Sequence, residues 1–180
     1  MSEIPALTIL IRAVDFAAGK HRMQRRKDAE ASPYINHPIA LARVLVEAGI
    51  EDPVVLCAAV LHDTVEDTET SVEELREQFG AEIAGVVAEV TDDKSLDKAT
   101  RKERQVLRAP HSSPAAKLVK LADKICNLRD LLASPPAGWP AERKHEYFVW
   151  AGRVIDGLRG THAGLEAMFD GLLARASEFR

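Results

Sequence analysis

The chain is short of the features that mark membrane-spanning and secreted proteins. Its 180 residues include two cysteines and 5% aromatic residues. No apolar run approaches the roughly 20 residues that a membrane-spanning helix needs. The first residues, Met-Ser-Glu-Ile-Pro, lack the basic and then apolar segments of a signal peptide. These absences predict a soluble, cytoplasmic protein with no membrane partner.

An excess of positive charge is also absent. The 24 Lys and Arg residues against 28 Asp and Glu residues give a formal net charge of -4, whereas proteins that bind duplex nucleic acid usually present a strongly basic face. We therefore expect no nucleic-acid partner. Positive charge is nevertheless dense in residues 20–27 and 94–104. Alone, each cluster is typical of a solvated face, but beside a metal it would favour a small, highly phosphorylated ligand.

The two cysteines indicate no disulfide framework. Cys57 and Cys126 lie in apolar, helical-looking segments and form neither a CxxC pair nor a zinc-ribbon spacing. We expect both to be buried free thiols, since unpaired cysteine behaves as a small apolar side chain.

Apolar residues recur at helical spacing, and strand alternation and hairpin dipeptides are missing. The sequence predicts an all-α fold, with residues 1–180 forming one domain of about eight to ten helices. At 46% hydrophobic content, the chain can bury a full core. The expected helices span about residues 4–19, 37–48, 53–62, 72–79, 81–90, 99–108, 114–132, 141–159 and 164–176.

Proline and capping residues set several of these helix starts. Asp52-Pro53 and Ser113-Pro114 each place a capping side chain before a proline, which suits the first helical turn. Ser71 and Glu74 match a capping box. By the same logic His37, which precedes Pro38, is expected to cap its helix and to point off the helix end.

A polar pair, His62-Asp63, follows the apolar run 54–61 at the end of the expected central helix. Burying such a pair is costly unless something satisfies it, and histidine with aspartate can hold a divalent metal ion. His37 and Asp123 are the best candidates for two further ligands. Two imidazoles and two carboxylates suit Mn²⁺, Fe²⁺ or Zn²⁺. Singly, each residue also fits a structural role, as a helix cap or a paired carboxylate.

Three further polar residues belong near this candidate site. Glu66 and Asp67 lie one helical turn beyond His62 and Asp63, where carboxylates could orient water or transfer protons. They could equally form an acidic turn that caps the next helix. Asn127 follows Asp123 by four residues and shares its helix face, so its amide is expected to point toward the metal or its ligand.

Eight short segments together resemble one family. They are residues 25–28, 33–38, 61–68, 90–94, 109–114, 117–124, 127–130 and 146–148. These segments are similar to the HD-domain hydrolase of RelA/SpoT-type alarmone enzymes, and in particular to the small stand-alone hydrolases of the metazoan SpoT homologue (Mesh1) type. The resemblance covers nearly the whole chain and implies an HD-domain helical bundle.

The resemblance also implies an activity and a site. Such enzymes use Mn²⁺ to hydrolyse the guanosine alarmones ppGpp and pppGpp to GDP or GTP and pyrophosphate. It assigns the metal to His37, His62, Asp63 and Asp123, and the catalytic water and its protons to Glu66 and Asp67. It assigns substrate binding to Arg26, Lys27, Lys98, Asn127, Trp139, Arg143 and Tyr147.

Two alternative functions remain open at this point. The same site could remove the 2′-phosphate of NADPH, giving NADH and phosphate, because a ribose 2′-phosphate lies close to the place of a 3′-diphosphate. The fold could also bind nucleotides without turnover, although every expected ligand and Glu66 are present. Apolar residues on the last two helices could serve the core or a homodimer face.

Overall fold

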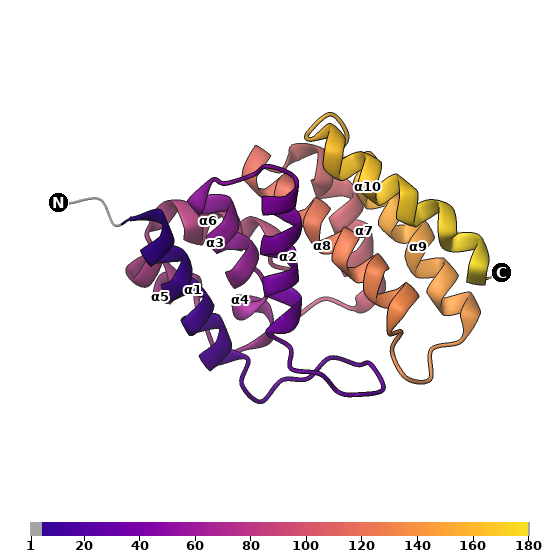
Figure 1. Ribbon diagram of the computed structural model, residues 1–180, viewed down its shortest axis with the longest axis horizontal. Coiled ribbons are helices and arrows are strands. Elements are labelled where there is room, and N and C mark those ends of the chain that lie inside the picture. The colour runs from indigo at the N-terminus through magenta and orange to yellow at the C-terminus, as the bar shows by residue number, and fades with distance from the viewer. Residues whose placement is uncertain (1–4, 180) are drawn as a thin grey trace.

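A computed structural model describes residues 5–179, and these residues are almost entirely helical (Figure 1). The prediction of an all-α fold is confirmed. Within this range the strand-like geometry is one isolated bridge between Arg25 and Pro33. The α-helices are α1 Ala6–Lys20, α2 Asn36–Glu47, α3 Pro53–Leu61, α4 Thr64–Asp67, α5 Val72–Phe79, α6 Ala81–Val90, α7 Lys98–Arg108, α8 Pro114–Ala133, α9 Ala141–Asp156 and α10 Ala163–Leu173. Short 3₁₀ helices span Ala109–His111 and Ala174–Phe179.

Helix α3 is the centre of the core. Every residue from Val55 to Leu61 is buried, and α1, α2, α6 and α8 all pack against this helix. Figure 1 shows α1 and α5 at one end of the molecule and α9 and α10 at the other, with α2 and α8 side by side between them. Because α3 is apolar on all sides, it is buried in the core. The polar pair His62-Asp63, which follows it directly, therefore lies in the interior.

The expected capping residues begin three helices. Asp52 accepts hydrogen bonds from the backbone N–H groups of Val54 and Val55 at the start of α3. Ser113 accepts one from Ala116 at the start of α8, and Ser71 accepts one from Glu74 at the start of α5. These bonds satisfy backbone donors that have no partner inside the helix.

The prediction that His37 caps α2 is wrong. The helix begins one residue earlier, at Asn36, and Ile35 before it already has helical dihedral angles of -56° and -22°. A turn starting at Pro33 causes this, since the N–H groups of Asn36 and His37 donate to the carbonyls of Pro33 and Tyr34. His37 therefore lies in the first helical turn, and its side chain points inward rather than off the helix end.

The other boundaries fall within a few residues of expectation. Helix α9 ends at Asp156, ahead of Gly157 and of Gly160, whose φ of +84° is unfavourable for other residues. Helix α10 ends at Leu173, and its expected last turn is 3₁₀ instead. The expected start of the first helix at Ile4 lies outside the described residues. That residues 1–180 form one domain stays a prediction.

Two loops meet near the C-terminal end of α8 (Figure 1). Residues 21–35 connect α1 to α2, residues 134–140 connect α8 to α9, and the Ala137 N–H donates to the Lys27 carbonyl at 2.9 Å. Both cysteines are buried and unpaired, as predicted, and burial raises the pKa of Cys57 to about 11 and that of Cys126 to about 12. Among the described helices, none is long and apolar enough to cross a membrane.

Candidate metal centre

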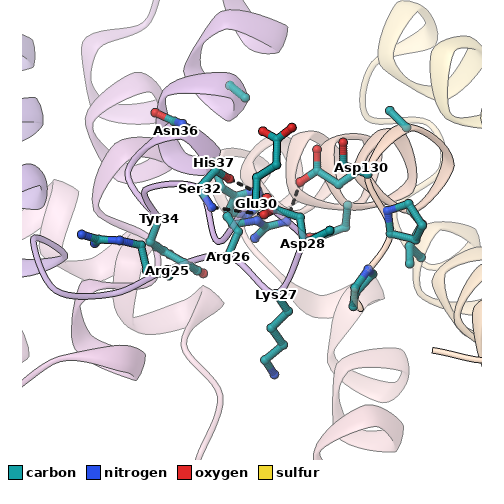
Figure 2. Close-up of a pocket in the computed structure, with 18 of the residues that line it drawn as sticks. Arg25, Arg26, Lys27, Asp28, Glu30, Ser32, Tyr34, Asn36, His37 and Asp130 are labelled. Carbon is teal, nitrogen blue, oxygen red and sulfur yellow. Dashed lines mark hydrogen bonds and ion pairs between the residues drawn. The ribbon is translucent and has the colours of Figure 1, made fainter. Parts of the chain in front are cut away.

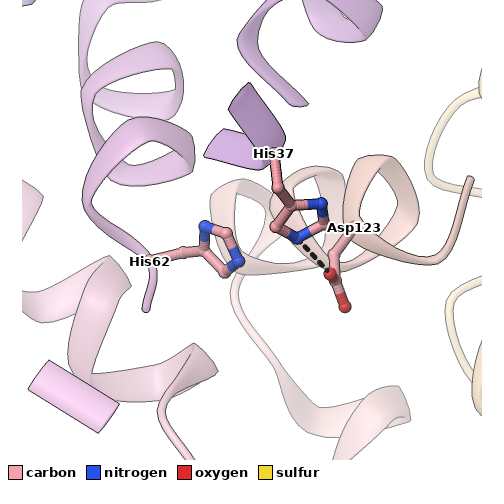
Figure 3. Close-up of side chains that lie close together, drawn as sticks. All are labelled: His37, His62 and Asp123. Carbon is pink, nitrogen blue, oxygen red and sulfur yellow. Dashed lines mark ion pairs between the residues drawn. The ribbon is translucent and has the colours of Figure 1, made fainter. Parts of the chain in front are cut away.

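Three side chains from three helices converge at the end of α3. His37 comes from α2, His62 directly follows α3, and Asp123 comes from α8 (Figure 3). One ligand atom from each lies within 4.8 Å of the others, and the three residues are only 5%, 5% and 8% exposed. His37 Nε2 is 3.3 Å from Asp123 Oδ1. The structure therefore brings together three of the four predicted metal ligands.

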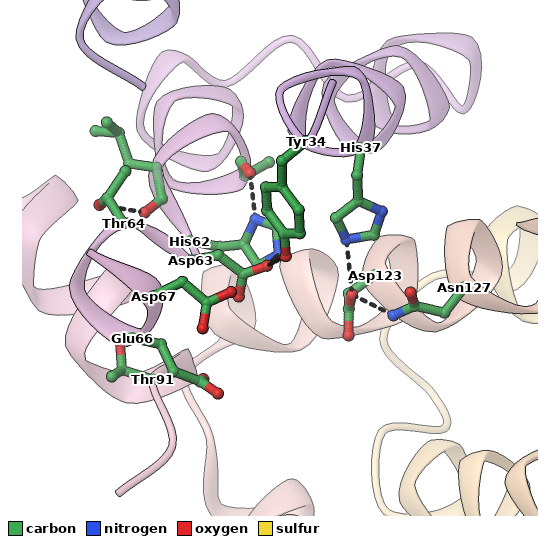
Figure 4. Close-up of polar contacts among 12 residues, drawn as sticks. Tyr34, His37, His62, Asp63, Thr64, Glu66, Asp67, Thr91, Asp123 and Asn127 are labelled. Atoms are coloured by element: carbon green, nitrogen blue, oxygen red, sulfur yellow. Dashed lines mark hydrogen bonds and ion pairs between the residues drawn. The ribbon is translucent and has the colours of Figure 1, made fainter. Parts of the chain in front are cut away.

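Asp63, the fourth predicted ligand, lies beside this group. Its Oδ2 is 2.9 Å from His62 Nε2 and accepts a hydrogen bond from the Tyr34 hydroxyl (Figure 4). Burial alone would raise the pKa of Asp63, but the neighbouring His62 and His37 hold it well below its ordinary value. Asp63 is thus an ionised carboxylate at the rim of the three-residue group.

His62 is oriented as a metal ligand should be. Its Nδ1 bonds to the Ala59 carbonyl at 2.8 Å, which turns Nε2 toward His37 and Asp123. Nε2 is buried and makes no hydrogen bond of good geometry among the described residues. Ligating histidines commonly donate their other ring nitrogen to a carbonyl and leave one nitrogen for the ion. Two imidazoles with carboxylates therefore fit a divalent transition metal.

The Asp123 carboxylate is held on both oxygens. Asn127 Nδ2 donates to Oδ1 at 2.6 Å, and Lys124 Nζ donates to Oδ2 at 3.0 Å. Burial would raise the pKa of Asp123, but the Lys124 ammonium and the two histidines hold it well below the ordinary value. Asn127 therefore lies where its helical spacing places it, against a candidate ligand.

Glu66 and Asp67, on the short helix α4, have different hydrogen-bond partners (Figure 4). The Asp67 N–H donates to the Asp63 carbonyl at 2.8 Å, so these two residues are one turn apart as expected. Glu66 Oε2 accepts from the Asp92 N–H at 3.1 Å, and burial raises the pKa of Glu66 above its ordinary value. Asp67 instead accepts from Gln24 and Lys94.

A cavity of about 860 Å³ opens beside the centre (Figure 2). His37 and Asp67 reach its wall, and Arg26 extends toward Asp130, with which it forms an ion pair. Five of the predicted substrate-binding residues line it. They are Arg26, Lys27, Asn127, Trp139 and Tyr147.

A second cavity, of about 550 Å³, shares part of this lining. The two predicted substrate-binding residues missing from the first cavity, Lys98 and Arg143, line the second. The Arg143 guanidinium lies 4.1 Å from the centre of the Trp139 ring. Three residues border both cavities. They are Lys27, Trp139 and Tyr147. All seven predicted substrate-binding residues therefore surround two adjoining hollows.

Other contacts around the centre were not expected from the sequence. From the loop 21–35, Tyr34 donates a hydrogen bond to Asp63 and Gln24 donates one to Asp67. Helical spacing does not predict contacts between a loop and a helix that are so far apart in the sequence. Lys124 reaches back to its own neighbour Asp123. The one available signal was that Tyr34 and Lys124 belong to segments used for the family resemblance.

Comparisons with known proteins agree with this geometry. A family profile described as "HD domain" matches residues 13–152. The chain is 61% identical over 158 residues to the Mus musculus protein named "Guanosine-3′,5′-bis(diphosphate) 3′-pyrophosphohydrolase MESH1", covering 87% of this chain and 88% of that one. The Drosophila melanogaster protein of the same name is 53% identical, over 89% and 90% of the two chains. A solved structure described as a metazoan ortholog of SpoT that hydrolyzes ppGpp superposes with a TM-score of 0.91, at 50% identity over 97% and 98% of the chains.

Proposed function

The chain belongs to the HD-domain family, and from that membership we propose that it is a ppGpp 3′-pyrophosphohydrolase. It would convert ppGpp to GDP, and pppGpp to GTP, with release of pyrophosphate. One observation carries the proposal: His37, His62 and Asp123 converge within 4.8 Å beside a cavity whose lining includes basic and aromatic side chains. The relatives named for this reaction match almost the full length of the chain.

We propose His37, His62, Asp63 and Asp123 as the ligands of a Mn²⁺ ion. Such an ion would polarise a phosphoryl oxygen and lower the pKa of water. The buried Nε2 of His62, which faces Asp63 Oδ2 at 2.9 Å, and the lowered pKa of Asp63 support this ligand set. Asp63 lies next to the group, since its Oδ2 is 2.9 Å from His62 Nε2.

The reaction needs one proton removed and one proton delivered. Water oxygen bonds to the phosphorus that carries the ribose 3′-oxygen, the bond between that phosphorus and the 3′-oxygen breaks, and the 3′-oxygen takes up a proton. Glu66 is the better proton acceptor, because burial raises its pKa. Asp67 already accepts hydrogen bonds on both oxygens, from Gln24 and Lys94, which suits a residue that orients the water.

The two cavities suit the two charged ends of such a nucleotide. The first cavity borders His37 and Asp67 and would hold the ribose and its 3′-diphosphate. The second contains Lys98, Arg101, Lys102 and Arg143, which would neutralise the 5′-phosphates, since Lys and Arg are the usual partners of phosphate oxygens. Trp139, which borders both, offers an aromatic face.

Product analysis on two substrates tests the proposal. The purified protein, reconstituted with Mn²⁺, is incubated with ppGpp and in parallel with NADPH, and pyrophosphate and orthophosphate are separated. We expect pyrophosphate from ppGpp, at a higher catalytic efficiency than orthophosphate from NADPH. Orthophosphate alone from ppGpp, or no product, contradicts the proposal. A higher efficiency on NADPH would assign the site to the 2′-phosphatase reaction instead.

A further inference from the structure

Lys124 is a charged side chain buried next to the candidate metal centre. It follows Asp123 on α8 and is only 3% exposed. Removing an ammonium from water is costly unless a counter-charge and further contacts compensate. Within the described residues its Nζ makes one hydrogen bond, to Asp123 Oδ2 at 3.0 Å. The Lys124 ammonium therefore donates to one oxygen of one candidate metal ligand.

This contact makes the two oxygens of Asp123 different from one another. Lys124 holds Oδ2, whereas Oδ1 accepts from Asn127 at 2.6 Å and lies 3.3 Å from His37 Nε2. With Oδ2 held by Lys124, the carboxylate cannot rotate to exchange its oxygens without breaking a charge-assisted bond, which is stronger than one between neutral groups. Oδ1 is thereby kept on the side of the histidines.

Trp150, on α9, also contacts the ammonium. The centre of its ring lies 4.5 Å from Lys124 Nζ, within the range of a cation–π contact. The indole is itself fixed, because its N–H donates to the Lys102 carbonyl on α7 at 3.0 Å. Lys124 thus contacts both a carboxylate and an aromatic ring that is anchored to a third helix.

We propose that Lys124 is a positioning residue that fixes Asp123 for metal binding. It acts on the ion only through Asp123, by keeping Oδ1 directed at His37 and His62, and Trp150 keeps Lys124 in place. The inference rests on the proposed function for its choice of Mn²⁺. It does not depend on the substrate.

Metal affinity provides the test, because it is measured without turnover. Lys124→Met keeps the length of the side chain and its contact with Trp150 but removes the N–H donors. Lys117→Met, two turns earlier on α8, is the matched control. Free Mn²⁺ is followed by its electron paramagnetic resonance signal during titration of each protein. We expect the dissociation constant of Lys124→Met to rise about 10- to 100-fold, the usual effect of losing a group that orients a ligand, and that of Lys117→Met to stay at the wild-type value.

The dependence of turnover on Mn²⁺ provides a second readout. If Lys124 acts through Asp123, the variant needs more Mn²⁺ for half-maximal activity, and kcat returns toward the wild-type value when Mn²⁺ saturates. An unchanged or lower dissociation constant for Lys124→Met would overturn the proposal, since a purely electrostatic role would tighten binding once the cation is gone. If wild type binds Mn²⁺ but releases no pyrophosphate, the proposed function fails while the titration still decides the role of Lys124.

A second variant covers the case in which Lys124→Met does not fold. Trp150→Leu leaves Lys124 and Asp123 unsubstituted and removes the aromatic face that holds the ammonium. We expect weaker Mn²⁺ binding than in wild type, by a smaller factor than for Lys124→Met. Wild-type affinity in a folded Trp150→Leu protein, as judged by its circular dichroism, would contradict the proposed arrangement.

Discussion

Replacing Glu66 with glutamine removes one negative charge from the centre while keeping the shape of the side chain. Glu66 Oε2 accepts a hydrogen bond from the Asp92 N–H at 3.1 Å, and the glutamine oxygen can keep that bond. Packing around α4 should therefore survive. What is lost is the ability to take a proton, so this substitution separates catalysis from binding.

The size of the effect follows from the role proposed for Glu66. A side chain that transfers a proton in the transition state contributes about 10²- to 10⁴-fold to the rate, or about 3 to 5 kcal/mol in the activation free energy. We expect Glu66→Gln to lower kcat by that factor and to leave the dissociation constant of ppGpp within a few-fold of wild type. Glu77→Gln, an exposed change on α5, should match wild type in both.

The proposed role of Glu66 also predicts the direction in which turnover changes with pH. As a proton acceptor Glu66 must be ionised, so activity falls as the pH falls through its pKa. Burial and the nearby Asp63 and Asp92 charges raise that pKa, while the Asp92 N–H and Lys120 oppose the shift. The acidic limb of the kcat/KM profile should thus lie above the ordinary glutamate range and be absent from Glu66→Gln. Wild-type kcat in this variant, or an unchanged acidic limb, would refute the role, and equal binding without turnover by either protein would favour a nucleotide-binding module.

Three further outcomes are expected. Tyr34→Phe removes the hydrogen bond to Asp63 and should weaken Mn²⁺ binding at least about tenfold; calorimetric titration giving the wild-type affinity would contradict this. Mn²⁺ at 100 times its dissociation constant should add about 2.7 kcal/mol to the free energy of unfolding, so urea midpoints that agree with and without EDTA would exclude a native metal site. Phe148→Ala should cost about 3 to 5 kcal/mol, because Phe148 is fully buried and lies against Phe179; urea unfolding in EDTA measures this loss.

Helical spacing and capping chemistry predicted most of the fold. The apolar run before His62 and the caps at Asp52 and Ser113 act within a few residues, so the sequence alone contains their cause. The start of α2 was misplaced by one residue because the turn beginning at Pro33 outweighed the tendency of a residue before proline to leave helical geometry. Local rules compete at such a boundary, and the sequence does not show which prevails.

The candidate site likewise contains some contacts that the sequence predicted and others that it did not. Asp123 and Asn127 were predicted together because four residues on one helix share a face, and the structure joins them at 2.6 Å. The contact of Tyr34 with Asp63 depends on how the loop 21–35 folds against the end of α3, and that of Lys124 with Trp150 depends on how α9 packs against α8. Tertiary packing sets these contacts, and only the structure reveals them.

The fate of isotopically labelled water tests the central claim most directly. The Mn²⁺-loaded protein is allowed to hydrolyse ppGpp in H₂¹⁸O, and the products are resolved by mass spectrometry and ³¹P NMR. Attack at the phosphorus that carries the 3′-oxygen predicts GDP without label and pyrophosphate with one ¹⁸O atom. Label in the ribose hydroxyl of GDP, or labelled orthophosphate in place of pyrophosphate, would contradict a 3′-pyrophosphohydrolase built on His37, His62, Asp63 and Asp123.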